Sequence, residues 1–440
     1  MPDTGLPTEQ KKYNWGQSPI VLKSLLMRNL VCLLTLVSGI ILFTGCNNKK
    51  AHVDENGVTV ISVDFNKSQK VSMKDLISRI EIVELEGRPD SYFRSPRWFQ
   101  VADGKYFMDC RYTETVYAFD SDGRFLFNTS YRKGNGHNEY LYLNGFFVDK
   151  NGCINIYCNA TGLVRYDSAL NTVSYNKTIN STLNDAKVEK LSFPTKPIPV
   201  SDGILAYFAE VSEDSMKVEF YSTALNKTIG GSGIPFQNIH TTQFAIKRIH
   251  NPVANDKEVL YRLCRIGDFS VFRLNAKDKT ITEAYRYDTG NNMFTESHYS
   301  SIREPYGRKH EEELHKLFAE YTSLWDLHVN NHFMLAVLGG MNLSDRKANK
   351  NLYLSFYSPQ DGKHRLINTQ MDNGKELCYI DWLDDEAIYT LVEGYMLDDV
   401  DIMVDPDLLD ERSKQILKQR NDDTNAYIIK YYLKNNILTQ

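Results

Sequence analysis

Residues 131–157, YRKGNGHNEYLYLNGFFVDKNGCINIY, contain two glycines at the spacing of a phosphate-binding loop. A dinucleotide-binding loop needs a third glycine three positions after Gly136, so that the following helix can pack against its strand, and Glu139 stands there instead. A mononucleotide-binding loop places Lys-Ser or Lys-Thr after its last glycine, and this segment has neither. Because a strand-like run follows, Gly134 and Gly136 predict a turn between strands rather than a nucleotide site.

Three polar residues of the same loop are candidates for ligand binding. Arg132, His137 and Glu139 offer a cation, an imidazole and a carboxylate close together in the sequence. Binding residues concentrate on loops that a rigid scaffold positions, so this group is the ligand-binding hypothesis that the sequence supports. The alternative is a solvated turn without a ligand.

His310 and His315 raise the question of a zinc site. Metalloprotease histidines stand four positions apart so that both face one side of a helix, whereas a spacing of five turns them about 140° apart. Leu314, Leu317 and Phe318 mark the buried face of an ordinary amphipathic helix. We therefore predict no metal at these histidines.

A run of aspartates near the C-terminus suggests calcium: Asp398, Asp399, Asp401, Asp405, Asp407 and Asp410. An EF-hand loop needs alternating acids, a glycine at its sixth position and a closing glutamate, and this run lacks that spacing. Asp405 followed by Pro406 instead predicts the first residues of a helix. We predict no cofactor, with calcium in a central channel as the alternative that stays open.

The sequence nominates no catalytic residue. It contains no Gly-x-Ser-x-Gly motif, and no Ser, His and Asp set can be chosen from spacing alone. The cysteines that follow the N-terminal segment contain no metal-binding Cys-x-x-Cys, and we interpret them as small buried strand residues with one disulfide allowed: Cys110, Cys153, Cys158, Cys264 and Cys378. Whether the protein is an enzyme is left open.

The N-terminus predicts export. Residues 30–43 form an apolar run of 14 residues after Arg28, which is too short to cross a bilayer and fits a signal peptide. The run ends in Phe-Thr-Gly-Cys, which resembles the lipobox of bacterial lipoproteins and makes Cys46 the expected lipidation site. We therefore assign residues 1–46 to an N-terminal extension with a lipoprotein signal peptide and residues 47–57 to a tether. The expected location is the cell envelope, lipid-anchored, at the outer membrane.

The composition points to a β-rich globular protein. Of the 440 residues, 42% are hydrophobic and 12% aromatic, led by 27 tyrosines, which favours half-buried strands. The net charge of −5, with both signs intermixed, gives no basic surface for nucleic acid. We expect no nucleic-acid partner.

A repeated pattern of apolar alternation, an aromatic residue, a turn residue and a second apolar run occurs six times along the chain. Its turn positions are Asp120, Asp167, Ser222, Asn275, Ser358 and Leu433, spaced by 47, 55, 53, 83 and 75 residues. The two longest intervals each contain an extra helical stretch of roughly 25 residues, and without it the period is about 50. Each copy predicts a hairpin closed by residues that tolerate tight-turn backbone angles.

Two more strand-like runs precede each hairpin. In the second copy they are joined by Asp149-Lys150-Asn151-Gly152, a typical hairpin signal. Four short antiparallel strands per repeat are typical of propeller blades, so we predict an all-β, six-bladed β-propeller over residues 58–440 with two helical insertions. The sixth copy supplies only three strands, and a strand near residues 80–86 is expected to complete it.

The motifs of this chain resemble those of the six-bladed β-propeller lipoproteins of Gram-negative gut bacteria. In that family a Gly-x-Gly-Pro-Gly-Glu-Tyr pattern precedes a strand ending in Asp, and five residues match it: Gly134, Gly136, Glu139, Tyr140 and Asp149. His137 and Asn138 replace the Pro and Gly. The likeness extends to the lipobox and to KVSMKDLISRIEIVELEG, residues 70–87. It implies the fold and export, but not an activity.

The function expected from these features is that of an envelope lipoprotein whose propeller binds or scaffolds an unidentified envelope protein, glycan or small ligand. The alternative is a propeller hydrolase or lactonase acting on a small envelope or dietary substrate, since such enzymes assemble their sites from single residues of several blades. An acidic cluster in the channel with bound metal would favour the enzyme. An apolar or aromatic rim would favour a binding protein.

Chain reversal within each blade predicts the working face. The link between blades and the turn between the second and third strands emerge on one face, so residues 132–140 and the helices near 305–321 and 406–420 belong to the same face. We expect the ligand over the channel mouth on that face, near Arg132, His137 and Glu139.

Overall fold

The computed structural model separates residues 1–50 from a compact unit of residues 51–440, and the second unit alone is described here. Its described residues are 51–158, 162–176, 197–211, 215–235, 253–254, 259–262, 268–295, 297–298, 301, 308–340, 352–377, 379–393, 396, 399–420 and 425–438. The predicted signal peptide and Cys46 lie outside them.

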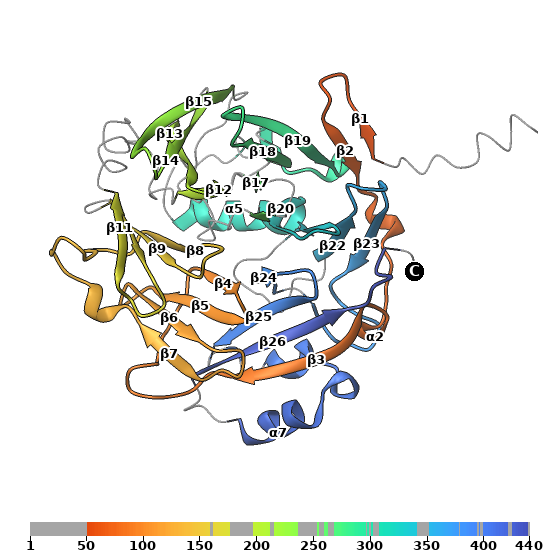
Figure 1. Ribbon diagram of the computed structural model, residues 1–440. Helices are drawn as coiled ribbons and strands as arrows, with labels where there is room; N and C mark the ends of the chain where they lie inside the picture. The colour runs from red at the N-terminus through yellow and green to blue at the C-terminus, as the bar shows by residue number, and fades with distance from the viewer. Residues whose placement is uncertain are drawn as a thin grey trace, which may run out of the picture. The chain divides into compact units, whose positions relative to one another are not determined.

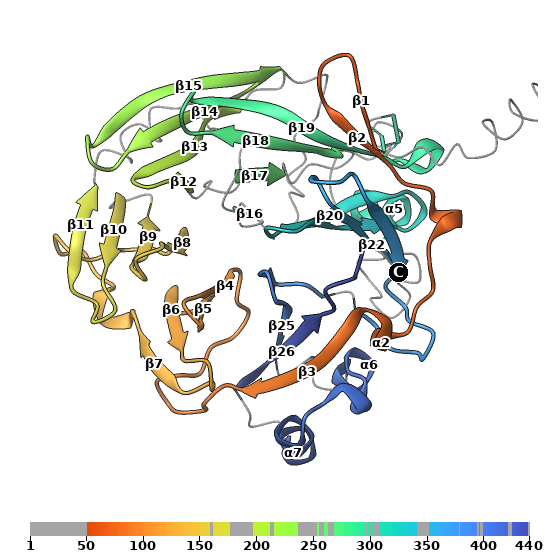
Figure 2. The same ribbon diagram turned by 45° about the vertical axis from the view of Figure 1, so that its right-hand side comes forward.

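Six antiparallel sheets form a ring of blades, which confirms the predicted all-β, six-bladed propeller (Figures 1 and 2). Blades one to three are β4 (Phe99–Ala102), β5 (Lys105–Cys110), β6 (Thr115–Phe119) and β7 (Phe125–Asn128); β8 (Gly145–Val148), β9 (Ile154–Cys158), β10 (Gly162–Tyr166) and β11 (Thr172–Asn176); and β12 (Ile198–Ser201), β13 (Ile204–Val211), β14 (Ser215–Ser222) and β15 (Lys227–Pro235).

The remaining blades repeat the same order of neighbouring strands. They are β16 (Val253–Ala254), β17 (Val259–Arg262), β18 (Ser270–Asn275) and β19 (Thr280–Asp288); β20 (Ser323–Val329), β21 (Met334–Gly339), β22 (Leu352–Tyr357) and β23 (His364–Asn368); and β24 (Trp382–Leu383), β25 (Ala387–Glu393), β26 (Ala426–Leu433) and β3 (Ile77–Glu84). Blade six is therefore completed by a strand from the start of the propeller, as predicted. In that pairing Tyr427 lies opposite Glu84 and Tyr431 opposite Ile80, which closes the ring non-covalently.

The six repeated turn positions all fall at the end of a third strand, which confirms the repeat. Asp120 and Asp167 use their carboxylates alike, since each accepts from the backbone N–H groups two and four positions ahead, at 2.8–2.9 Å. Asn275 accepts from the N–H groups of Lys277 and Asp278 at 2.9 and 3.0 Å. These side chains mimic a backbone acceptor and stabilise the turn.

Blade four carries two additional strands at its outer edge. β2 (Thr59–Ser62) pairs in parallel with β19, with Thr59 opposite Tyr285, and β1 (His52–Val53) pairs with β2. The sheet therefore begins at His52, inside the range 47–57 that the sequence assigned to a tether.

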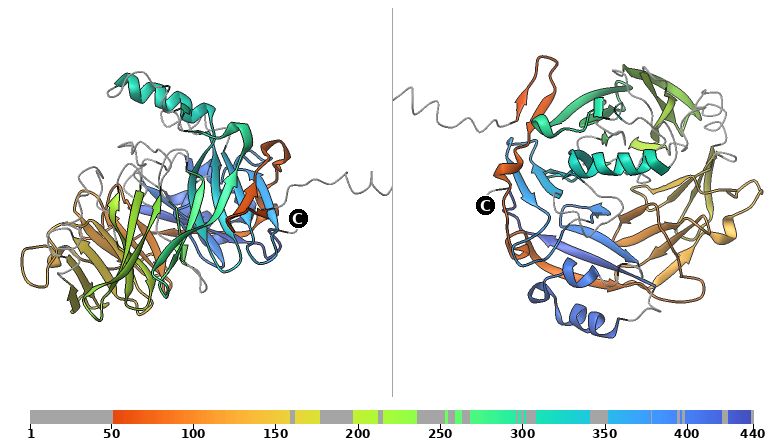
Figure 3. Two further views of the ribbon diagram at one scale, coloured as in Figure 1. Left: turned by 90° about the horizontal axis from the view of Figure 1, so that it is seen from above. Right: turned by 180° about the vertical axis from the view of Figure 1, so that it is seen from behind.

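Two helical excursions leave the blades where the sequence predicted them. α5 (Arg308–Glu320) lies between the last strand of blade four and the first of blade five, and stands clear of the sheets on one face of the ring (Figure 3). The segment between β25 and β26 holds α6 (Val400–Met403), η6 (Pro406–Leu408) and α7 (Glu411–Gln419). No helix in the described part of the chain is long and apolar enough to span a membrane.

α7 lies at the outer edge of the ring and not over the channel mouth, where we expected the ligand. It runs along the outside of β3, where the Ile82 N–H donates to Ser413 Oγ at 2.8 Å (Figures 1 and 2). The helix begins at Asp410, which accepts from the Ser413 N–H at 2.7 Å. α7 therefore covers the exposed edge of blade six.

The blades pack through apolar side chains, but not equally. The largest buried cluster joins blades five and six with α5 and α2 (Met73–Leu76), and includes Phe318, Trp325 and Tyr431. Blades two and three share a cluster of six buried apolar residues among those described, the smallest in the ring: Phe147, Tyr157, Leu163, Leu205, Tyr207 and Tyr221.

Candidate functional site

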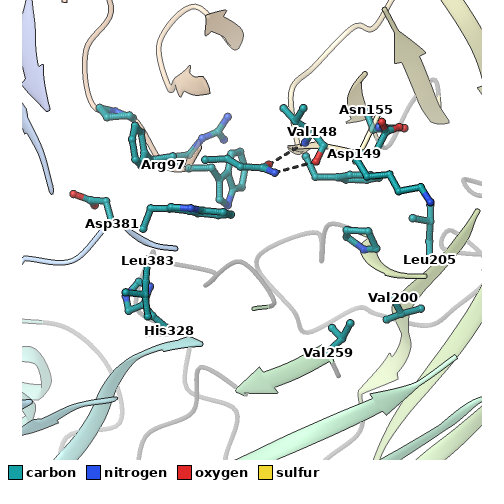
Figure 4. Close-up of a pocket in the computed structure, with 18 of the residues that line it drawn as sticks. Arg97, Val148, Asp149, Asn155, Val200, Leu205, Val259, His328, Asp381 and Leu383 are labelled. Atoms are coloured by element: carbon teal, nitrogen blue, oxygen red, sulfur yellow. Dashed lines mark hydrogen bonds between the residues drawn. The ribbon is translucent and has the colours of Figure 1, made fainter. Parts of the chain in front are cut away.

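A cavity of about 990 Å³ occupies the centre of the ring (Figure 4). Residues of the first strands of blades one, two, three, five and six line it, together with residues just before and after those strands. Its volume is at the upper end of the range for small-molecule sites. The cavity is the strongest candidate for a functional site in the part of the chain that the structure describes.

Slightly more than half of the cavity wall is apolar. Its large apolar and aromatic lining residues include Trp98, Phe99, Phe147, Val148, Leu163, Val200, Leu205, Val259, Leu327, Val329, Ile380, Trp382, Leu383, Leu391 and Met396. The charged lining residues nearly balance in sign: Arg97, Arg111, Lys150 and Arg165 against Asp149, Asp202, Asp326, Asp381 and Glu393. Such a wall suits a ligand with an apolar body and a few oriented polar groups.

Arg97 and Trp98 are fixed at the cavity by a buried carboxylate. Asp109 is fully buried and accepts from the N–H groups of Arg97 and Trp98 at 2.6 and 2.9 Å, and from Arg97 Nε at 2.7 Å. Arg97 Nη2 also donates to the Leu143 carbonyl at 2.9 Å. The guanidinium lies 4.3 Å from the centroid of the Trp98 ring.

Gln100 joins the inner strands of blades one and two. Its Nε2 donates to the Val148 carbonyl and its Oε1 accepts from the Val148 N–H, both at 2.9 Å (Figure 4). The side-chain amide thus bonds the N–H and the carbonyl of Val148 as the backbone of a neighbouring strand would, and it holds β8 against β4 at the cavity.

A polar network lies where the second blade meets the cavity. Asp149 ends β8, and its Oδ2 accepts from Arg165 Nε at 2.8 Å and from Asn155 Nδ2 at 3.1 Å. Its Oδ1 accepts from the Asn151 and Cys153 N–H groups. Burial alone would raise the pKa of Asp149, but these bonds to the ionised form outweigh it and hold the pKa below its usual value.

Blade five contributes an acid and an imidazole to the cavity. His328 Nε2 lies 3.2 Å from Asp326 Oδ1 on β20, and both side chains are about one-tenth exposed. The contact lacks hydrogen-bond geometry, so Nε2 has no hydrogen-bond partner in the described part of the chain. An imidazole beside a carboxylate can act as a proton acceptor. Within the described residues, no three His, Cys, Asp or Glu side chains are arranged to hold a metal ion.

The predicted ligand-binding residues Arg132, His137 and Glu139 do not line the cavity. Each contacts a different neighbour: Arg132 lies 5.7 Å from the Tyr166 ring centroid, His137 packs on Tyr175 at 5.2 Å, and Glu139 binds Gly136 of its own loop. Among the described residues, no hydrogen bond or ion pair joins two of the three side chains. Their role in ligand binding stays a prediction.

The glycines of this loop serve Glu139 rather than a phosphate. Glu139 Oε2 accepts from the Gly136 N–H at 2.8 Å, and a Cβ at Gly134 would lie 2.1 Å from that oxygen. The loop links β7 of blade one to β8 of blade two, as predicted. Its glycines make room for the folded-back carboxylate.

The other sequence candidates have structural roles where they are described. Asp405 caps η6 by accepting from the Asp407 N–H at 3.1 Å, as the Asp-Pro pair predicted, and Asp401 pairs with Arg420. The side chains of His310 and His315, and Asp398, lie outside the described residues. Three of the cysteines are buried free thiols: Cys110, Cys153 and Cys158.

Sequence reasoning missed the residues that line the cavity because each blade contributes only a few. Their position beside the first strand of a blade could have identified them: Arg97 stands two residues before β4, and Asp149 directly follows β8.

Comparisons with known proteins agree with this architecture. A family model, DUF5128, described as a 6-bladed beta-propeller, matches residues 47–380. A crystal structure of a "Putative exported protein" from Bacteroides fragilis is similar with a TM-score of 0.61 at 14% identity, covering 86% of this chain and 100% of the other. A member of the duf4221 family from Bacteroides vulgatus aligns with a TM-score of 0.44 at 11% identity, covering 81% and 99%. A search of curated proteins finds no match to this sequence.

Proposed function

This chain belongs to the DUF5128 family of six-bladed β-propellers, and we propose that it is an exported, lipid-anchored envelope protein that binds a small amphipathic ligand in its central channel. The lipid anchor rests on the lipobox-like sequence that ends at Cys46. Two acyl chains or more would hold the protein at a membrane surface, at about 0.8 kcal/mol per buried CH₂.

The observation that carries the binding proposal is the wall of the central cavity. It combines apolar surface, slightly more than half of the wall, with polar groups fixed by Asp109, Gln100 and Asp149. Pre-oriented polar groups in an apolar cavity provide specificity at a small loss of entropy on binding. An apolar ligand body bearing a few hydrogen-bonding groups fits this wall best.

Native mass spectrometry of protein loaded with an extract of its own envelope tests the proposal. Leu383, on β24 of blade six, is 4% exposed and lines the cavity, so Leu383→Trp should narrow the cavity and reduce the fraction of protein that carries the bound mass. The matched control is Leu225→Trp, at a turn residue that is 62% exposed. If Leu383→Trp does not fold, Val200→Trp at a half-buried lining position replaces it. An unchanged bound fraction in both narrowing variants would exclude the channel as the binding site.

A propeller hydrolase is the second candidate, and the pairing of Asp326 with His328 in the cavity is the observation that favours it. In that case His328 would accept a proton from water or a substrate hydroxyl. Turnover of chromogenic esters and lactones that falls strongly in His328→Gln, with ligand binding retained, would support the enzyme. Absence of turnover with every ester and lactone tested would count against the hydrolase and favour the binding protein.

A further inference from the structure

The contact between blades two and three differs from its neighbours because polar side chains occupy positions that face the adjacent blade. Across blade two, Phe147, Asn155, Arg165 and Ser174 stand directly opposite one another and share one face of the sheet. The corresponding row of blade one, which faces blade two, is Gln100, Phe107, Ala118 and Phe127. On the second and third strands, blade one thus has the apolar Phe107 and Ala118, whereas blade two has the polar Asn155 and Arg165 at the corresponding positions.

The opposite face of blade two shows that this polarity is local. Its row toward blade one is apolar and fully packed, with Phe146, Ile156 and Val164 buried in one cluster. A sheet between two neighbours should be apolar on both faces. A face that departs from this rule in a folded protein marks a site where function has replaced packing.

Blade three presents a matching polar wall. Tyr207 OH donates to Glu219 Oε2 at 2.6 Å, and Glu219 also pairs with Lys217 at 2.7 Å. Leu205 and Tyr221 share this face and pack against Phe147 and Leu163 of blade two. The interface therefore combines apolar contacts of Phe147, Leu163 and Leu205 with polar residues from both blades.

The central cavity extends into this interface. Its lining includes Asn155, Arg165, Ser174 and Asn176 from the outer three strands of blade two, and Leu205, Thr223 and Ala224 from blade three. Across its entrance Lys150 of blade two pairs with Asp202 of blade three, and both are largely exposed, so this ion pair holds the entrance only weakly. We call this extension the side cleft.

Arg165 is oriented for a ligand in the side cleft. Its Nε is taken by Asp149, whose four accepted hydrogen bonds fix the carboxylate. The guanidinium also contacts the Cys153 thiol, a weak acceptor, and its two terminal amino groups have no oxygen acceptor among the described residues. A guanidinium held by one edge presents its other donors as a fork that suits an oxyanion.

We propose that the side cleft binds an elongated ligand with an apolar body against Phe147, Leu163 and Leu205 and an oxyanion, such as a carboxylate or sulfonate, on Arg165. This inference rests on the proposed function and deepens it, because it names the ligand class and the part of the channel that selects it.

The test uses two fluorescent probes of similar shape, the sulfonate 8-anilinonaphthalene-1-sulfonate and the neutral N-phenyl-1-naphthylamine. Arg165→Met retains the apolar stem and removes the charge, and should weaken sulfonate binding about tenfold while leaving the neutral probe unchanged. The control is Arg124→Met, a 72% exposed arginine in a turn of blade one outside the cavity, which should bind both probes as the parent does. Equal sulfonate affinity in parent and Arg165→Met would overturn the proposal.

A filling substitution locates the probes. Leu205→Trp should exclude both probes from the side cleft. If Leu205→Trp does not fold, Ser174→Trp replaces it, since Ser174 is half-buried on the outermost strand of blade two. Retention of both probes in a folded filling variant would overturn the proposal. The two proposals fail separately. If the parent binds no envelope ligand but binds the sulfonate probe through Arg165, the proposed function is wrong and the side cleft stands; if the envelope ligand binds and Arg165→Met leaves sulfonate affinity unchanged, only the side cleft is wrong.

Discussion

At the scale of single residues, two carboxylates beside the cavity obtain their partners both from the backbone and from other side chains. Asp109 accepts two backbone N–H groups and Arg97 Nε, and Asp149 accepts two backbone N–H groups, Asn155 and Arg165. A carboxylate anchored to a turn or strand end cannot rotate, so the arginine bound to it is held in one orientation. Two of the three cavity arginines, Arg97 and Arg165, are positioned in this way.

His364 provides a residue-scale prediction about pH. Burial lowers its pKa to about 4, and its Nε2 lies 2.9 Å from Ser355 Oγ. The unfolded chain, with a histidine pKa of about 6.5, binds more protons between these values, so the free energy of unfolding should decrease as the pH falls from about 6.5 to about 4. His364→Gln retains a hydrogen-bonding group without the titration and should reduce this decrease by up to about 3 kcal/mol.

Urea unfolding of both proteins at about pH 7 and about pH 4.5 measures the difference. Above about pH 6.5 the contribution is fully present, so the variant should differ from the parent by a constant offset there. An identical pH dependence in the two proteins would show that His364 titrates normally in the folded state.

Gly134 allows a second prediction at this scale. An alanine Cβ there would displace the Glu139 carboxylate from the Gly136 N–H, so Gly134→Ala should cost about 1 kcal/mol of stability. In the Glu139→Ala background the same change should cost almost nothing, because the oxygen it meets is gone. Denaturant unfolding of the four proteins gives the coupling. A penalty of equal size in both backgrounds would instead place the requirement for glycine in the backbone.

At the scale of elements, an exposed strand edge is covered by a helix. β3 is the outermost strand of blade six, and α7 supplies an acceptor to one of its outward N–H groups through Ser413. Ile80 also forms a parallel bridge with Leu409, just before α7. Covering an edge in this way prevents it from pairing with another chain.

Ser413→Ala tests this contact. Ser413 is fully buried, so removing its hydroxyl leaves the Ile82 N–H without an acceptor and should cost about 2 kcal/mol. The matched control is Ser78→Ala in the same strand, where an exposed hydroxyl donates to the Tyr432 carbonyl at 3.1 Å and the loss should be within about 0.5 kcal/mol. Thermal unfolding compares the two. Equal losses would mean that α7 contributes nothing specific to the edge.

The elements differ in how far the sequence predicts them. The third-strand turns are predictable because the Asp and Asn side chains that close them act within four residues. The parallel pairing of β2 with β19 is not, because it joins residues 59–62 to residues 285–288 and leaves no local pattern. The sequence predicts where the helices occur in the chain but not where they lie on the ring. α7 packs on the outer edge of β3, and that edge exists only because β3 completes blade six.

The candidate site was predictable only in part. The alternation of INIYC and GLVRY places Asn155 and Arg165 on the same face as Tyr157 and Leu163, so polar residues on a blade-facing surface can be read from the sequence once the blade is recognised. Which of the two faces they occupy requires the order of the blades around the ring. The predicted group Arg132, His137 and Glu139 shares a loop that does not line the cavity, so proximity in the sequence did not identify the cavity residues.

At the scale of the whole molecule, the ring is closed by apolar interfaces of unequal size. Blades five and six share the largest described cluster with α5, while blades two and three share the smallest and enclose the side cleft. A closed ring tolerates one poorly packed interface because every blade is held on its other side. Because β3 closes the ring, blades two and three stay in place even though polar residues replace apolar contacts between them.

Two truncations test closure. A chain starting at Val71 loses β1 and β2 but retains α2 and β3, and should remain monomeric with one cooperative transition and a modestly lower Tm. A chain starting at Arg88 also loses β3, which exposes the edge of β26 from Tyr427 to Leu433 and opens the apolar cluster that includes Ile80 and Ile82. Unpaired strand edges associate, so this chain should aggregate and unfold without cooperativity. Size-exclusion chromatography and calorimetry compare the two, and a shorter chain as soluble and cooperative as the longer one would show that the ring does not depend on β3.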